Sequence, residues 1–535
     1  MNIKAEIKKM IEESLGITDV EVNETPSESF GDYSTNLAFN YKKGKPPIEV
    51  AKEIIQSLRV DTSMIKKVGA AGPGFINFWL KEDYLKNCVL KIMDEGSQYG
   101  ASNLGNGKQV LVEFVSANPT GPLNVANGRA AAIGDSLVRI LNFTGYKADA
   151  EYYVDDSGTQ IERLEKSIKA RYDELDGKKV QFPEDGYRGD YIIDIARELK
   201  VTEGELKVTG SKDFREFGVQ KIIDMQKAAL KNFGVEFKKW IYESSIRKSG
   251  KPEEIIKILK AKGLAYEQAG ALWIKTTAFG DEKDRVLVKS NGEYTYLLPD
   301  IGYHLDKFER GYDWLINLWG PDHHGYIPRI KAGISACGYP GDKLTVIIVQ
   351  WVTLVRGAEK VGMSKRKGEF VTLEDLISEV GKDVARFFFL TRKAEAHLDF
   401  DIELAKRESA ENPVYYVQYA HARISSILRY AREQNISMEE RADVSLLGEP
   451  EELSLIKKLV HFPEIVETAA RHLEPHRIPF YLLELATLFH NFYEKHRVVT
   501  DNIPLTMARL NLVLAVRQTL KNGLSLIGIT APERM

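Results

Sequence analysis

The stretch VEFVSANPTGPLNVANGRAAAIGDSLVRIL, residues 112–141, decides the fold class of this chain. It starts with a short apolar run that only Glu113 interrupts, a pattern typical of a buried parallel strand. Apolar residues then recur at helical spacing until Gly145, which favours a helix end. Strand signals return in KADAEYYV, so the segment predicts a βαβ unit.

The turn of this unit, NPTGPLNVAN, opens a helix N-terminus at the carboxyl end of the strand. Free backbone N–H groups at such a place bind anions, above all phosphates. Many α/β proteins carry a similar turn without any ligand. The turn alone therefore leaves a phosphate site and a purely structural role equally open.

The chain has 535 residues, more than one hydrophobic core usually serves, so several domains are expected. Helices mixed with short strands predict a small N-terminal α/β domain over residues 1–100. Residues 105–400 are predicted to form a Rossmann-type parallel-sheet domain with a helical insertion at about 161–239. Residues 404–535 lack strand signals and predict a C-terminal helical bundle. The expected fold class is multidomain α/β.

Later strand signals extend the expected parallel sheet. The segments ALWIKT and RVLVKS follow the insertion, and WLINLWG and LTVIIVQWV come after them. We expect these segments to complete the sheet that the opening βαβ unit begins.

The composition is that of an ordinary globular protein, with 43% hydrophobic and 28% charged residues. The first residues indicate an amphipathic helix rather than a signal peptide, and every apolar run is too short to span a bilayer. Two cysteines, Cys88 and Cys337, exclude a disulfide framework. We therefore expect a cytoplasmic protein with no membrane partner. The net charge of −3 excludes a strongly basic protein but allows RNA binding through local patches.

Two downstream motifs carry groups suited to a nucleotide and a cation. In GMSKRKGEF, Lys365, Arg366 and Lys367 crowd a loop, where flexible cations can follow charge that develops on phosphates. A solvated basic loop is the commoner meaning of such a run. In YTYLLPDIGYHLDK, Tyr296 and Asp300 place a phenol near a carboxylate, a combination that suits a guanidinium.

A third motif, WGPDHHGY, offers a metal-binding alternative through Asp322, His323 and His324. A metal-dependent phosphoesterase needs further clustered Asp and His residues, which the sequence lacks. We therefore expect no metal site, and a phosphoesterase is a distant third hypothesis.

Several motifs, taken in order, resemble the arginyl-tRNA synthetase family of class I aminoacyl-tRNA synthetases over nearly the whole chain. They are FGDYSTNLAF, GPGFINFWL, SANPTGPLNVANGR, YTYLLPDIGYHLDK, WGPDHHGYIPR, GMSKR, NPVYYVQYAHARI and APERM. The resemblance implies activation of L-arginine by ATP, with Mg²⁺ accompanying ATP, and transfer to tRNA(Arg). It also implies a monomer whose N-terminal domain contacts the tRNA elbow and whose helical bundle binds the anticodon.

The resemblance assigns residues by position. In the implied arginine site, Glu113 and Asn118 hold the amino group and the carboxylate of the substrate. Tyr296 and Asp300 bind its guanidinium, and His323 lies on the rim of the pocket. The ATP site is implied to comprise Asn124, Ala126, Asn127, Met363, Ser364 and Lys365, with Asn124, Asn127 and Lys365 catalytic. The implied tRNA-binding residues are Asn77, Tyr415, Tyr419 and Arg423, and Tyr416 and His421 belong to the same aromatic and basic run.

Both class I signatures depart from the family pattern. Where the family has His, an apolar residue, Gly and His, residues 124–127 are Asn, Val, Ala and Asn, and Gly362 replaces the usual first lysine of the second signature. Hydrogen bonds to charged groups contribute about 1.5–3 kcal/mol against about 1 for neutral pairs, so we expect slower adenylation. Two main hypotheses follow: an active ligase with reduced activity, or a synthetase-like protein that binds tRNA or arginine without adenylation.

Overall fold

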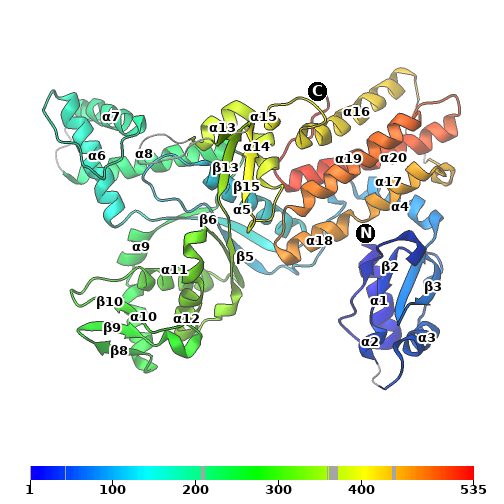
Figure 1. The fold of residues 1–535 in the computed structure, drawn as a ribbon, viewed down its shortest axis with the longest axis horizontal. Helices are drawn as coiled ribbons and strands as arrows, with labels where there is room; N and C mark the ends of the chain where they lie inside the picture. Colours follow the sequence, from blue (N-terminus) through cyan, green and yellow to red (C-terminus); the bar gives the residue numbers. More distant parts are fainter. Residues whose placement is uncertain (1, 42–43, 207–210, 358, 361–370, 437–441) are drawn as a thin grey trace.

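The computed structural model describes residues 2–41, 44–206, 211–357, 359–360, 371–436 and 442–535. A central parallel sheet lies between two lobes on one side and a helical bundle with a small N-terminal domain on the other (Figure 1). In the described part of the chain, no helix is both long enough and apolar enough to cross a membrane.

The small N-terminal domain is a helix-covered antiparallel sheet of strand order β1-β2-β4-β3. Its helices are α1 (Ile3–Leu15), α2 (Ala38–Tyr41) and α3 (Pro47–Ser57), with η1 at Glu28–Phe30. Its strands are β1 (Asn23–Glu24), β2 (Tyr33–Thr35), β3 (Ile65–Ala71) and β4 (Phe75–Leu80). Helix α1 buries Ile3, Ile7 and Ile11, whose four-residue spacing places them on one face against the sheet.

The central sheet has five parallel strands in the order β12-β11-β5-β6-β7. They are β5 (Gln109–Glu113), β6 (Lys147–Val154), β7 (Lys239–Tyr242), β11 (Trp314–Trp319) and β12 (Leu344–Ile348). Helix α5 (Val125–Phe143) connects β5 to β6, which confirms the predicted βαβ unit and the Rossmann-type sheet. Because the strand order reverses at β5, a crevice is expected at its carboxyl end.

Two of the segments expected in the parallel sheet form a different one. The strands β8 (Ala265–Gln268), β9 (Ala271–Ile274) and β10 (Arg285–Val288) make a separate antiparallel sheet. The turn between β8 and β9 has only two residues, Ala269 and Gly270, both at positive φ. A two-residue turn of this kind closes a hairpin and cannot serve a parallel connection, so this part of the prediction was wrong.

The segment LTVIIVQWV also divides between two sheets. Its first part is β12 in the central sheet, and its end enters β13 (Val352–Arg356). Strand β13 pairs with β14 (Glu359–Lys360) and with β15 (Leu398–Asp401). The short helices around this third sheet are α13 (Leu373–Val380), α14 (Lys382–Phe389) and α15 (Ile402–Ala405).

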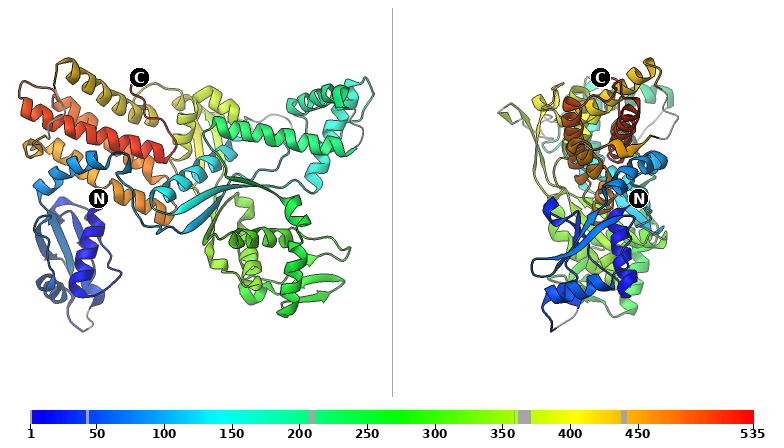
Figure 2. Two further views of the ribbon diagram at one scale, coloured as in Figure 1. Left: turned by 180° about the vertical axis from the view of Figure 1, so that it is seen from behind. Right: turned by 90° about the vertical axis from the view of Figure 1, so that its right-hand side faces the viewer.

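The helical insertion comprises α6 (Thr159–Leu175), α7 (Asp190–Leu206) and α8 (Ser211–Asn232). It projects from the body as an outer lobe, and α8 runs from that lobe back to the central sheet (Figure 2). The lobe has its own core, formed by Leu164, Ile168, Ile192, Ile195, Ala196 and Ile222. The second lobe contains β8–β10 with α9 (Glu243–Lys248), α10 (Lys251–Ala261), α11 (Leu297–Glu309) and α12 (Ile327–Cys337), and with η3 (Thr276–Phe279), η4 (Pro321–Tyr326) and η5 (Gly341–Lys343).

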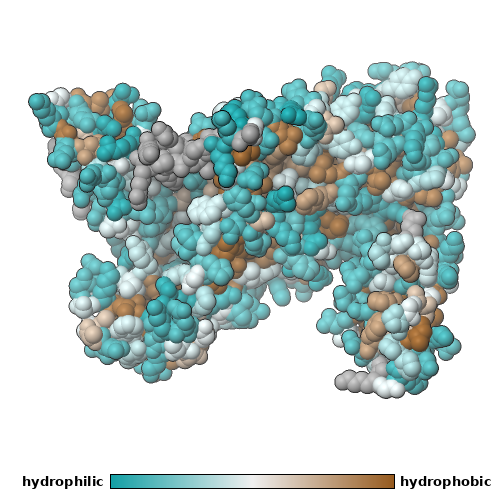
Figure 3. Space-filling view, in the orientation of Figure 1, coloured by the Kyte–Doolittle hydropathy of each residue, from teal (hydrophilic) through white to brown (hydrophobic). Residues whose placement is uncertain are grey.

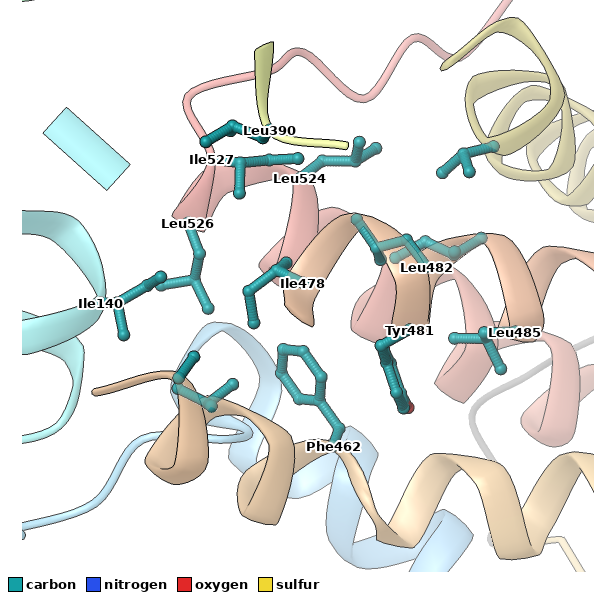
Figure 4. Close-up of a cluster of buried hydrophobic side chains, with 14 of the residues drawn as sticks. Ile140, Leu390, Phe462, Ile478, Tyr481, Leu482, Leu485, Leu524, Leu526 and Ile527 are labelled. Carbon is teal, nitrogen blue, oxygen red and sulfur yellow. The ribbon is translucent and has the colours of Figure 1, made fainter. Parts of the chain in front are cut away.

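The C-terminal region is a helical bundle. Its helices are α16 (Pro413–Glu433), α17 (Pro450–Val460), α18 (Phe462–His472), α19 (Arg477–Lys495) and α20 (Ile503–Leu526), with η6 at Val444–Leu446. Side chains of the bundle such as Phe462 and Leu526 meet Ile140 of α5 in one continuous core (Figure 4). The bundle and the parallel-sheet domain therefore share buried apolar surface.

Helix α4 (Glu82–Glu95) falls within the expected N-terminal domain but packs against α17 and α20 of the bundle. Its buried side chains, including Leu85, Val89 and Ile92, supply the apolar face for that contact. We therefore propose that the N-terminal α/β domain ends with β4 at Leu80.

Candidate active site

The backbone of the turn after β5 has an uncommon conformation. Val115 and Ser116 both have positive φ, at 68° and 39°. For a β-branched residue such as Val115 this region is disfavoured, so surrounding contacts must hold the turn in place. The chain then runs through Pro119 and Gly121 to the start of α5.

Asn124 and Asn127 cap helix α5 reciprocally. The Oδ1 of Asn124 accepts from the backbone N–H of Asn127 at 3.0 Å, and the Oδ1 of Asn127 accepts from the N–H of Asn124 at 3.0 Å. Because a backbone N–H can only donate, both side-chain oxygens face the backbone and both amide NH₂ groups face away from it. Among the residues that the structure describes, neither NH₂ group has a hydrogen-bond partner. The helix N-terminus therefore presents two oriented donors.

This reciprocal cap has a sequence signal of its own, which the prediction for the turn did not include. Asparagine is among the best N-cap residues, and reciprocal bonding with the third helical residue is a known N-terminal pattern. Ala126 lies between the two caps in the first turn and is partly exposed.

The second signature lies outside the described residues, so Gly362, Met363, Ser364 and Lys365 have no structural account. The chain resumes beside the first signature, where Asn124 and Thr372 form an antiparallel bridge. The N–H of Leu373 donates to the Leu123 carbonyl at 2.9 Å. The chain that follows the second signature thus starts next to the two oriented amides.

The expected guanidinium pocket lies on α11. Although burial opposes its charge, His304, Tyr326 and Lys307 together hold the pKa of Asp300 below its usual value. The ring of His304 lies 3.3 Å from an Asp300 carboxylate oxygen. Tyr296 is 64% exposed, and a Cβ added to Gly158 would lie 3.4 Å from its hydroxyl oxygen. The phenol of Tyr296 therefore lies beside the loop that follows β6, one helical turn before the ionised carboxylate of Asp300.

Two further carboxylates join this pocket, Asp155 after β6 and Glu243 after β7. The Ser157 hydroxyl donates to Glu243 at 2.8 Å. Burial raises the pKa of the Tyr153 hydroxyl, and the charges of Glu243, Asp300 and Asp155 raise it further. Neither Asp155 nor Glu243 was predicted from the sequence, although each follows a parallel strand at the edge where ligands bind.

Burial, with a contribution from Glu243, raises the pKa of Asp155 to about 7. A bound cation stabilises the ionised form, so below this pKa a guanidinium ligand must displace a proton and binds more weakly. We expect the KM for the arginine that the resemblance implies to fall as the pH rises from 6 to 8. Steady-state kinetics of Asp155→Asn should show a flatter pH profile, and an unchanged profile would contradict the assignment.

Glu113 has partners that the sequence did not reveal. Its carboxylate accepts from the buried Lys307 at 2.5 Å and from the Ser116 hydroxyl at 3.1 Å. Lys307 also lies 3.3 Å from Asn317, whose amide contacts His304 at 3.0 Å. A buried polar chain thus runs from Glu113 beneath the pocket to Asp300.

The remaining predicted arginine-site residues lie at its edges. The amide of Asn118 donates to Gln160 of α6 at 3.0 Å. His323 is exposed on η4, with its ring centre 6.0 Å from that of Trp319. Within the described ranges, the only metal-type cluster is Glu24, His461 and Glu464, between the N-terminal domain and α18. That cluster does not include Asp322, His323 or His324, so the phosphoesterase hypothesis has no structural support.

Comparisons with known proteins match one family of proteins along the length of this chain. Residues 1–80 match the arginyl tRNA synthetase N terminal domain, 88–389 the catalytic domain of class I (R) tRNA synthetases, and 417–535 the DALR anticodon binding domain. The chain is 48% identical over 521 residues to arginine-tRNA ligase 1 of Halalkalibacterium halodurans, covering 96% of this chain and 94% of that protein. It is 46% identical to the arginine-tRNA ligase of Geobacillus kaustophilus, with both chains covered completely (100%).

The chain belongs to the arginyl-tRNA synthetase family. It is an aminoacyl-tRNA ligase of class I. The arginyl-tRNA synthetase of Thermus thermophilus shares the fold, with a TM-score of 0.80 at 24% identity over all of both chains.

In this arginyl-tRNA synthetase, the expected RNA-binding residues of the bundle form a row on α16. The rings of Tyr415 and Tyr419 stack with their centres 6.2 Å apart, and the Arg423 guanidinium lies 4.9 Å from the ring centre of Tyr493 on α19. Arg423 and Tyr493 line a groove of about 640 Å³ that also includes Tyr430. Aromatic rings beside cations suit unstacked bases.

Two other residues of that run have structural roles. His421 is buried, its Nδ1 contacts the Pro532 carbonyl at 2.7 Å, and burial lowers its pKa. It therefore holds the C-terminal segment against α16. Tyr416 packs against the ring of His490, with the ring centres 4.6 Å apart. In the N-terminal domain, Asn77 on β4 is only 3% exposed.

Proposed function

We propose that this chain is an arginine-tRNA ligase that forms arginyl-adenylate from L-arginine and ATP and then transfers the arginyl group to tRNA(Arg). The observation that carries this proposal is the acidic pocket of Asp300, Asp155 and Glu243 at the same sheet edge as the capped start of α5. One site is suited to a guanidinium and the other to phosphates, as the reaction requires.

In the proposed reaction, the arginine carboxylate attacks the α-phosphate of ATP and pyrophosphate leaves. Asp300 and Tyr296 bind the guanidinium, since a buried guanidinium without a carboxylate would be strongly disfavoured. Asn118 serves the arginine carboxylate, Glu113 supports the amino-group site from beneath, and His323 lines the rim. Mg²⁺ accompanies ATP as the counterion of its phosphates.

The amides of Asn124 and Asn127 are proposed to donate to the ATP phosphates, beside Ala126. The reciprocal caps orient both NH₂ groups before ATP binds, which offsets part of the loss of charged histidine donors. Met363, Ser364 and Lys365 are proposed to complete the ATP site, on the strength of the family resemblance alone.

Nothing in the comparisons favours the alternative of a binding protein without adenylation, and the expectation of reduced activity receives no support from them. Arginine-dependent ATP–pyrophosphate exchange, measured with and without tRNA, tests the proposal. Exchange at an ordinary enzymatic rate is expected. Absence of exchange with intact tRNA binding would overturn it, and the variant Asn124→His, Ala126→Gly, Asn127→His would then show whether the first signature is the cause.

The tRNA is proposed to contact the bundle through Tyr415, Tyr419 and Arg423. The N-terminal domain would meet the elbow through the face of β4 that carries the exposed Phe75, whereas Asn77 is too buried to make the direct contact that the sequence predicted. Figure 3 shows apolar side chains on the surface of this domain. A cytoplasmic monomer is the state that we propose, and the two buried free cysteines are compatible with a reducing compartment.

Replacing Arg423 by alanine is expected to raise the KM for tRNA about 10-fold while leaving the KM for arginine unchanged. The guanidinium lies over two aromatic rings, and losing a cation and its stacking partner costs about 1–3 kcal/mol. Aminoacylation kinetics measure this effect. Arg432→Ala, on the same helix but outside the groove, is the matched control, and equal effects of the two variants would contradict the assignment.

A further inference from the structure

The strained turn between β5 and α5 receives hydrogen bonds from outside its own βαβ unit. The amide of Gln226 on α8 donates to the Gly121 carbonyl at 3.0 Å and to the Asn118 carbonyl at 3.3 Å. Gln226 is buried, and its Oε1 accepts from the Tyr152 hydroxyl at 2.9 Å. This side chain therefore has a fixed orientation between the sheet and the turn.

Tyr191 on α7 holds the same turn from another direction. Its hydroxyl donates to the Thr120 carbonyl at 2.8 Å. A Cβ added to Gly121 would lie only 2.9 Å from the Tyr191 oxygen, so glycine is needed for this approach. Burial raises the pKa of Tyr191, which therefore remains a neutral donor at physiological pH.

The remaining helix of the insertion, α6, also contacts the turn, since the Oε1 of Gln160 accepts a hydrogen bond from the Asn118 amide. Each helix of the outer lobe thus contributes one side chain to the segment between Asn118 and Gly121. The lobe has a separate apolar core, so its folding does not depend on these polar contacts alone. Two of the contacts, from Tyr191 and Gln226, instead supply hydrogen bonds to the carbonyl groups of Thr120 and Gly121, whereas the Asn118 carbonyl also accepts from the Thr120 N–H.

We propose that the helical insertion clamps the turn between β5 and α5, called the substrate turn from here on. In this proposal Tyr191 and Gln226 are positioning residues for adenylation. Neither side chain needs to touch ATP or arginine. By holding the carbonyls of Asn118, Thr120 and Gly121, they set the place of Asn118 on one side and of Asn124 on the other. A displacement of about 1 Å at reacting groups can cost about 100-fold in rate, so a looser turn should slow the chemical step.

The test rests on the proposed function and compares Tyr191→Phe with Tyr187→Phe. Tyr191→Phe removes one hydrogen bond and retains the ring. Tyr187 lies in the same lobe, and its hydroxyl makes no hydrogen bond to the turn within the described residues, so its variant is the matched control. The measurement is arginine-dependent ATP–pyrophosphate exchange in the presence of tRNA, with kcat expressed per titrated active site, together with thermal unfolding.

Tyr191→Phe is expected to lower kcat about 10-fold, with the KM for arginine changed less than 2-fold and the Tm close to that of the natural chain. Adding Gln226→Met should bring the loss in kcat to about 100-fold. A merely structural role would lower the Tm or the active fraction and leave kcat per active site unchanged, and that result would overturn the proposal. Absence of exchange in the natural chain would refute the proposed function instead.

A double-mutant cycle gives a second readout. Gly121→Ala introduces a methyl group against the Tyr191 hydroxyl, so it should lower kcat about 10-fold by separating the pair. Combined with Tyr191→Phe, it should cause less than the multiplicative loss, because the hydroxyl contact is already absent and only the approach of the added Cβ to the ring carbon Cζ, at 3.1 Å, remains. Fully multiplicative effects of the two substitutions would show that they do not act through one contact, against the proposal.

Discussion

Replacing Asp300 by asparagine is expected to lower kcat/KM for arginine by about 100- to 1,000-fold. The carboxylate is held ionised on α11, and removing one partner of a buried ion pair costs about 3–5 kcal/mol. Asparagine keeps the size of the side chain, so the loss should reflect charge rather than packing. Exchange kinetics over a range of arginine concentrations measure the effect, and thermal unfolding confirms that the variant folds.

The matched control for Asp300 is Asp322→Asn. Asp322 is exposed on η4, where its carboxylate lies 3.5 Å from His323. We expect this variant to retain kcat/KM within about 2-fold, since exposed pairs contribute little. If Asp300→Asn loses less than 10-fold, the guanidinium must be recognised mainly by Glu243 and Asp155, and the assignment of Asp300 fails.

Asn124→Asp is expected to lower kcat about 100- to 1,000-fold while leaving stability nearly unchanged. Aspartate caps a helix as well as asparagine, so the bond to the Asn127 N–H is retained. The substitution removes the NH₂ donor and places a negative charge near the phosphates. Loss of one preorganised donor typically costs about 10²–10³ in rate. Single-turnover adenylate formation measures the chemical step directly.

Asn124→Ala separates capping from catalysis. This variant loses both the acceptor and the donor of the side chain. Its free energy of unfolding should therefore fall by about 1 kcal/mol, in addition to the loss in rate. Comparison of the two variants therefore isolates the contribution of the amide NH₂. If Asn124→Asp formed adenylate as fast as the natural chain, the Asn124 amide would not contact the phosphates. Asn124 would then serve only as a helix cap.

Local sequence patterns predict the acidic residue and the phenol of the guanidinium pocket but not its full charge. Tyr296 and Asp300 are four positions apart at the start of one helix, so local spacing suffices to place them together. Asp155 and Glu243 join them only because β6 and β7 are neighbours in the sheet. That adjacency depends on how the chain crosses the insertion, which local patterns do not report.

The βαβ unit, the order of the three regions and the family follow from the amino-acid order alone, because they depend on local periodicity and contiguous motifs. The pairing of Glu113 with Lys307, 194 positions away, and the burial of His421 against the C-terminal segment appear only in the folded chain. The same is true of the outer helices that hold the substrate turn. Such contacts join residues that share no local pattern, and burial and hydrogen-bond geometry select them only when the elements pack.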